Sequence, residues 1–255
     1  MTSIDKKKFT KKHSPLEEHL LSEYIRLHSL HENNNWPSIL NLILTTKNIL
    51  NFYLYSFLFL YTTLHHIFEQ LIYYSPINFL FIIILNLFFA DFISGLVHIY
   101  LDHSKIRFDG SITDFHRLGF QVHHLYPDFQ WIMDPSYQAH YETITLYPMV
   151  IIGCMINTLT IQNLSIYIFS YCCLLFQAGH YWAHATTHHK YVPWFAKLLQ
   201  NTGIIIHPKT HQKHHQTYDN NYCILNGWSN FIFNYLEHNT NILDHYVKFI
   251  DMLIC

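Results

Sequence analysis

An apolar run that ends in histidine and aspartate is the most informative part of the chain: INFLFIIILNLFFADFISGLVHIYLDH, residues 77–103. Residues 77–101 are long and apolar enough to cross a membrane, which takes about 20 residues of helix. His98 and Asp102 stand four residues apart, so a helix places both on one face at the end of the span. The run therefore predicts a membrane helix that carries ligand-type side chains at one end.

Two more apolar segments, residues 48–74 and 143–182, predict further spans. The second is too long for one crossing and has the polar pair Gln162-Asn163 near its middle, so we expect two helices joined by a tight turn. The prediction is an all-α integral membrane protein of about four transmembrane helices, with a domain over residues 48–255. Residues 1–47 precede it as a basic tail and an amphipathic helix that ends near His31, which fits either the membrane surface or a face of the domain.

The positive charges indicate an orientation. With four spans, the N-terminus, the 102–142 segment and the 185–255 region share one side. All 15 Lys and Arg lie in these regions or at the start of the first span. The positive-inside rule places that side, with both termini and a histidine-rich helical cap, in the cytoplasm. This asymmetry and the span lengths argue against the alternative of a soluble helical bundle.

The composition points to a metal centre. The chain has 22 histidines, while only 13% of its residues are charged, and its net charge of −2 gives no electrostatic case for nucleic acid. Each buried imidazole needs a partner for its polar nitrogens, so histidine in this quantity is costly to explain as packing. The five cysteines form no Cys-x-x-Cys pair, which argues against a thiolate zinc site or a disulfide framework.

The histidines cluster at the predicted cytoplasmic side. A His-His pair lies in the loop after the second span, an i, i+4 pair ends the fourth span, and three histidines at i, i+3 and i+4 follow it. Each cluster alone is a weak signal, but together they supply more imidazoles than one tetrahedral zinc can use, which predicts two metal ions. Imidazole suits iron, zinc or copper. The candidate ligands are His98, His123, His124, His180, His184, His211, His214 and His215.

Three further residues are candidates for an additional ligand or a residue that orients one. Asp102 shares a helix face with His98. Asp91 is a carboxyl group inside a span, where such groups are usually functional, but it stands about 10 Å along the helix from His98 and cannot orient that imidazole. His140 lies beyond the His-His pair, with Glu142 nearby.

A histidine-rich two-metal site at a membrane face favours iron and dioxygen chemistry. The hydrogens of an unactivated alkyl chain are beyond acid–base side chains, so a metal–oxygen cofactor must remove them while the protein positions the chain. No protein residue need act as a nucleophile, and the metal centre carries the catalysis.

At these motifs the sequence resembles the Kua/CarF lipid desaturase family. The family includes plasmanylethanolamine desaturases and the plant plastid enzyme that desaturates phosphatidylglycerol. The matching pieces are Asp91-x-x-Ser94-Gly95-x-x-His98-x-x-x-Asp102, His123-His124-x-x-Pro127, Gln177-x-x-His180-x-Trp182-Ala183-His184, His211-x-x-His214-His215 and Gly227-Trp228-x-Asn230. Ile99 departs from the tryptophan that is usual after the first histidine.

The resemblance implies a di-iron, O2-dependent desaturase that acts on an alkyl or acyl chain of a glycerophospholipid. It also implies an external electron donor, such as cytochrome b5 or ferredoxin, and iron ligation by the eight histidines. A related di-iron lipid hydroxylase would use the same ligands. A histidine-rich metal transporter is an alternative from another class, but it would need ionisable groups near mid-membrane. The sequence specifies neither the head group nor the membrane.

Overall fold

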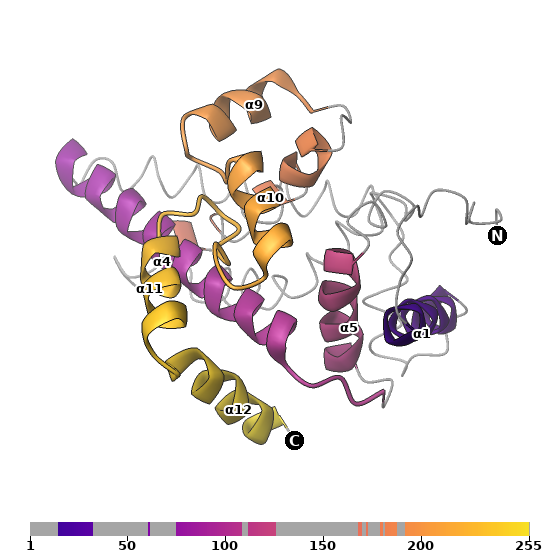
Figure 1. The fold of residues 1–255 in the computed structure, drawn as a ribbon. Helices are drawn as coiled ribbons and strands as arrows, with labels where there is room; N and C mark the ends of the chain where they lie inside the picture. Colours follow the sequence, from indigo (N-terminus) through magenta and orange to yellow (C-terminus); the bar gives the residue numbers. More distant parts are fainter. Residues whose placement is uncertain are drawn as a thin grey trace.

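The structure is a computed structural model that describes residues 15–32, 61, 75–108, 112–125, 168–169, 172, 179–180, 182–187 and 192–254. Regular secondary structure in these residues is helical throughout, as the sequence predicts (Figure 1). The predicted spans over residues 48–74 and 143–182 lie mostly outside the described residues, and His140 lies outside them. The labelled helices are α1 (Pro15–Glu32), α4 (Pro76–His103), α5 (Ile112–Leu125), α9 (Trp194–Asn201), α10 (Pro208–Thr217), α11 (Asn230–Asn239) and α12 (Ile242–Ile254).

Helix α4 matches the apolar run at 77–101. Ser75 caps its start by accepting a hydrogen bond from Asn78 N at 3.2 Å, and Pro76 occupies the first helical position, where no amide hydrogen is needed. Among the described residues, α4 is the single helix long and apolar enough to cross a membrane. Its N-terminal half exposes apolar side chains such as Ile77 and Phe81, whereas its C-terminal half is largely buried.

The C-terminal half of α4 packs against α11 and α12. Ile99 belongs to a core that includes Tyr222, Phe233 and Leu243. The helices approach closely at Gly95, where a Cβ atom would lie 2.5 Å from the Phe233 ring. Because Gly95 has no side chain, α4 and α11 can approach here more closely than any other residue would allow.

Helix α5 is a correction to the sequence prediction, which placed His123 and His124 in a loop. The helix forms because Leu118 and Val122, four residues apart, are both fully buried and give it an apolar face. The carboxylate of Asp114 in its first turn accepts a hydrogen bond from Arg107 N at 2.8 Å and ties the helix to the end of α4. This bond and the buried apolar face place the histidines of α5 beside the end of α4.

Helix α1 agrees with the predicted amphipathic helix and packs on the domain. Its Tyr24 ring faces Gly119 of α5, and its His19 ring lies 5.2 Å from the Phe108 ring, between centroids. Of the two placements that the sequence left open, the structure has the helix on the face of α5 (Figure 1).

Helix α10 carries three of the candidate ligands and is capped at its start by His207. The His207 ring accepts a hydrogen bond from Lys209 N at 3.2 Å, and Pro208 follows as the first helical residue. The helix ends where Tyr218 adopts a left-handed backbone conformation, with φ of 64°. Residues 220–229 then run back along α4 to the start of α11.

Candidate metal centre

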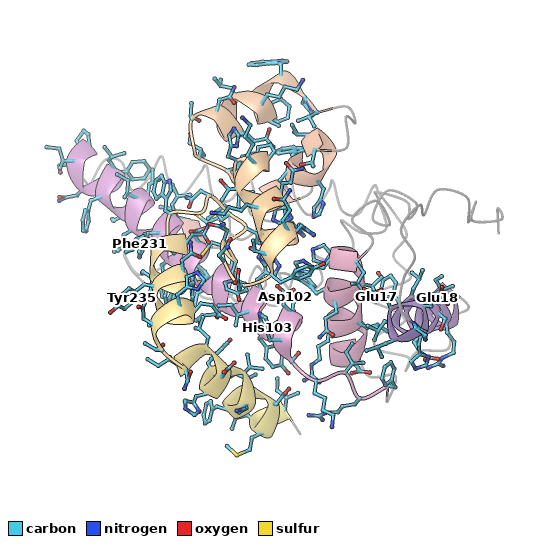
Figure 2. The ribbon with its side chains drawn as sticks, viewed as in Figure 1. Glu17, Glu18, Asp102, His103, Phe231 and Tyr235 are labelled. Atoms are coloured by element: carbon cyan, nitrogen blue, oxygen red, sulfur yellow. The ribbon has the colours of Figure 1, made fainter. Side chains whose placement is uncertain are left out.

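The structure brings all eight predicted histidines and Asp102 together in two adjoining groups. In each group the candidate ligand atoms lie within 4.8 Å of one another. Figure 2 shows Asp102 where α4, α5 and α10 meet. The five-histidine group contains His123, His180, His184, His211 and His215, and the Asp102 group contains His98, Asp102, His124 and His214.

The Asp102 group is centred on one carboxylate. Asp102 Oδ1 lies 3.0 Å from His124 Nε2, and Oδ2 lies 3.3 Å from both His98 Nε2 and His214 Nε2. His98 Nε2 and His214 Nε2 are themselves 3.2 Å apart. Three helices thus direct three imidazoles at one aspartate.

The five-histidine group is a chain of facing ring nitrogens. His184 Nε2 lies 3.2 Å from His180 Nε2 and 2.8 Å from His211 Nε2, which in turn lies 3.0 Å from His215 Nε2. The His123 ring completes the group from α5, with its centroid 4.8 Å from that of His215. His123 Nε2 has no hydrogen-bond partner in the described part of the chain.

Each His-His pair is divided between the two groups. On α5, His123 faces the five-histidine group and His124 the Asp102 group; on α10, His215 faces the former and His214 the latter. Successive helical residues point about 100° apart, so one helix end can serve two positions. The i, i+4 pairs behave oppositely, because residues four apart share a face: His180 and His184 stay together.

Backbone carbonyls orient two of the rings. His214 Nδ1 lies 2.7 Å from the carbonyl oxygen of Asn220, and His123 Nδ1 contacts that of Phe120. A carbonyl can only accept, so each Nδ1 carries a proton, and in the neutral ring Nε2 then presents a lone pair. A second partner of this kind is the usual support of a metal-binding histidine.

Burial favours the neutral, metal-binding form of four imidazoles outside the predicted spans. Burial lowers the pKa of His123, His211 and His215 well below the ordinary value of 6.5, and neighbouring imidazoles lower it further. Burial also lowers the pKa of His124, although the Asp102 carboxylate acts in the opposite direction. These rings need lose no proton to accept a metal ion near neutral pH.

The spacing of the nitrogens fits metal ions. The N–H of one ring can point at only one neighbouring nitrogen. Hydrogen bonds therefore account poorly for the three nitrogen–nitrogen contacts around His184 and His211. A cation in the centre would instead accept a lone pair from every ring. Two ligands that lie 2.0–2.1 Å from a metal at right angles are about 3.0 Å apart, and the contacts of 2.8–3.2 Å match this spacing.

One predicted residue within the described part of the chain lies elsewhere. Asp91 belongs to neither group. Its Oδ1 accepts hydrogen bonds from Asn226 N at 2.9 Å and Gly227 N at 3.0 Å, and its Oδ2 accepts one from Ser229 N at 2.8 Å. Asp91 therefore fastens the segment that follows α10 to α4. The prediction that it stands too far from His98 to orient that ring agrees with this position.

Residues 87–249 match the model of the lipid desaturase domain. The chain belongs to the lipid desaturase family. The matched range contains both groups of candidate ligands, and the resemblance seen in the sequence motifs is confirmed. No solved structure matches the chain.

The chain is similar to curated plant proteins. It is 31% identical over 149 residues to a protein named fatty acid desaturase 4-like 1, chloroplastic, from Arabidopsis thaliana, covering 54% of this chain and 46% of that protein. It is 38% identical over 66 residues to fatty acid desaturase 4, chloroplastic, from the same plant, covering 25% and 20%. The matched region spans less than half the length of each of these relatives.

Proposed function

We propose that this lipid desaturase is a membrane-bound, iron-dependent enzyme that introduces a double bond into a hydrocarbon chain of a glycerophospholipid. The observation that carries the proposal is the pair of adjoining, buried ligand groups at the C-terminal end of α4. Family membership supports the reaction class, and the donor atoms support the cofactor.

Two iron ions fit the two groups. The five-histidine group would hold one ion and the Asp102 group the other, because imidazole and carboxylate are both common iron ligands. When bound, iron would supply with O2 the oxidising power that breaks unactivated C–H bonds. The two electrons that complete the reduction of O2 would come from a separate donor of the cytochrome b5 or ferredoxin kind.

The ligand residues would keep water away from the two ions and would offset part of their positive charge. Side chains of both groups are buried or nearly so, and Asp102 contributes one negative charge against the charge of the metal. The role of this chain is to hold ring nitrogens in place and to keep them neutral, and the proposal assigns no nucleophile.

The proposed topology follows α4. Its apolar N-terminal half would lie in the bilayer, while its end, with both ligand groups, would lie at the cytoplasmic face. This arrangement, within about four spans and with both termini cytoplasmic, lets a lipid tail reach the ions from the membrane. A metal transporter would instead place ligands near mid-span.

The proposed substrate is an acyl chain, because the relatives named above are fatty acid desaturases. An ether-linked alkyl chain is the second candidate within the same reaction, and the two products differ chemically. A vinyl ether is cleaved by acid, whereas an acyl alkene is stable. Hydroxylation of the same chain would use the same ligands and leave an added oxygen.

The test is to express the chain in a host that lacks the activity, with a cytochrome b5 or a ferredoxin, and to record phospholipids by high-resolution mass spectrometry. A new species lighter by two hydrogens, absent with His184→Ala, is the expected result. His238→Ala is the matched control, because His238 is an exposed histidine of α11 outside both groups.

Other outcomes would contradict the proposal in distinct ways. A gain of one oxygen, lost with His184→Ala, would identify a hydroxylase. A membrane-inserted protein that binds no iron and changes no lipid would exclude the di-iron enzyme. Metal uptake into sealed vesicles without a lipid product would identify a transporter.

A further inference from the structure

A single peptide group connects α11 to the Asp102 group. The peptide between Asn220 and Asn221 accepts a hydrogen bond on its oxygen from His214 Nδ1 at 2.7 Å. Its N–H donates to Asn234 Oδ1 at 2.8 Å. The plane of this peptide is therefore held on both edges, by a candidate ligand on one side and by an asparagine side chain on the other.

Asn234 is a firm anchor because α11 is fixed to α4. The Phe233 ring, next to Asn234, is fully buried and stacks on Phe92 of α4 with centroids 5.0 Å apart. One turn earlier, Asn230 Oδ1 accepts a hydrogen bond from Cys223 N at 2.9 Å. Asn234 Nδ2 also lies 3.4 Å from Asn221 Oδ1, so the amide contacts the turn through both of its polar atoms.

The turn itself needs such an anchor. Tyr218 and Asn221 both adopt the left-handed region, with φ of 64° and 57°, which costs energy for residues other than glycine. Without the bond to Asn234, the peptide at 220–221 would be free to rotate its oxygen away from His214. His214 would then lose the acceptor that keeps its proton on Nδ1 and its Nε2 lone pair towards His98 and Asp102.

We propose that Asn234 is a positioning residue that acts through the 220–221 peptide to fix the tautomer and orientation of His214, and thereby the metal affinity of the Asp102 group. The proposal rests on the proposed function in that the group binds a metal ion. Because two hydrogen bonds through one peptide polarise each other, the Asn234 bond also strengthens the His214 bond.

The experiment measures metal binding rather than activity. Metal-free full-length protein in detergent is titrated with Co²⁺, and the absorbance of the bound ion and the number of ions per chain are recorded. Asn234→Leu removes the acceptor at similar size, Asn234→Asp keeps an oxygen acceptor, and Asn239→Ala is the control, because Asn239 is an exposed asparagine of the same helix. Thermal melts check folding.

We expect two ions per chain in the unsubstituted protein, in Asn234→Asp and in Asn239→Ala. In Asn234→Leu one ion should bind about 10–100-fold more weakly, the usual effect of losing a partner behind a ligand. The absorbance spectrum of the weakened ion should also change, while the other ion keeps its spectrum. The double variant with Asn234→Leu and His214→Ala should bind this ion no more weakly than the single variant His214→Ala does.

Equal affinity for both ions in Asn234→Leu and in the unsubstituted protein would overturn the inference. So would a weakening of both ions together that Asn234→Asp does not rescue, because that result describes a general loss of structure. If Asn234→Leu does not fold, Asn234→Ser, whose hydroxyl is too short to reach the peptide, replaces it with the same expectations. An unsubstituted protein that binds no ion at all contradicts the proposed function instead.

Discussion

Asp102 Oδ1 lies 3.0 Å from His124 Nε2, a contact that joins the end of α4 to the end of α5. Through its other oxygen the same carboxylate lies 3.3 Å from His98 and His214. One side chain thus contacts every histidine of its group. The negative charge of Asp102, as well as its shape, should therefore affect how tightly the Asp102 group binds a metal ion.

Asp102→Asn should selectively weaken metal binding in the Asp102 group. The amide keeps the size of the carboxylate but has no negative charge, and its NH2 would face either His124 or the His98–His214 pair. We expect binding of one of two Co²⁺ ions to fall at least about 10–100-fold. Asp244→Asn, an exposed substitution on α12, is the control. Retention of both ions at full affinity would remove Asp102 from the ligand set.

Asp91→Asn should lower stability while leaving the number of bound ions at two. Asp91 accepts three backbone hydrogen bonds, and the amide would turn an N–H towards at least one of the donors. We expect the free energy of unfolding to fall by about 1.5–3 kcal/mol. Denaturation followed by circular dichroism measures this. A variant that keeps its stability but loses an ion would make Asp91 part of the metal site.

The metal-free protein should lose stability as the pH falls below about 6.5. Burial lowers the pKa of His123, His211 and His215, so these rings stay neutral when folded but become protonated when unfolded. The unfolded state then binds more protons, and each such histidine costs about 1.4 kcal/mol per pH unit in this range.

Thermal melts of the metal-free protein at about pH 7.5 and about pH 5.5 measure this effect, with Tm expected to drop at the lower value. His211→Leu should reduce the drop, because it removes one of the buried rings, whereas replacement of the exposed His238 should not. An unchanged Tm across this interval would contradict neutral burial of the rings.

Gly95→Ala should destabilise the contact between α4 and α11. The new methyl group would lie 2.5 Å from the Phe233 ring and 2.8 Å from Cys223 Sγ, both in a packed core. Overpacking of this kind costs about 1–3 kcal/mol. Phe233→Leu in the same chain should recover part of the loss, which chemical denaturation would show. Additive losses in the double variant would place the strain elsewhere.

The sequence predicted which histidines meet but not how they divide. Local spacing was enough for the shared faces of His98 with Asp102 and of His180 with His184. The division of His123 from His124 depends on the rotation of α5, which the prediction treated as a loop. That helix was missed because it is short and because polar residues and histidines interrupt its apolar positions.

Long-range backbone contacts left no signal in the sequence. Asp91 stood out as a buried carboxyl group, but its partners are amide hydrogens more than a hundred residues away. Asn234 did not stand out at all, because a half-buried asparagine in a helix has no distinctive spacing. Both roles depend on the path of residues 220–229, which only the three-dimensional structure reveals.

The divided His-His pairs make α5 and α10 common supports of two ion positions. An ion that enters either position fixes the rotation of both helices, and so assembles most of the neighbouring position before a second ion arrives. Filling should therefore be cooperative. A preparation given half the metal it needs would consist mainly of empty and doubly filled molecules. Its average would be one ion per chain, although few molecules would hold one ion.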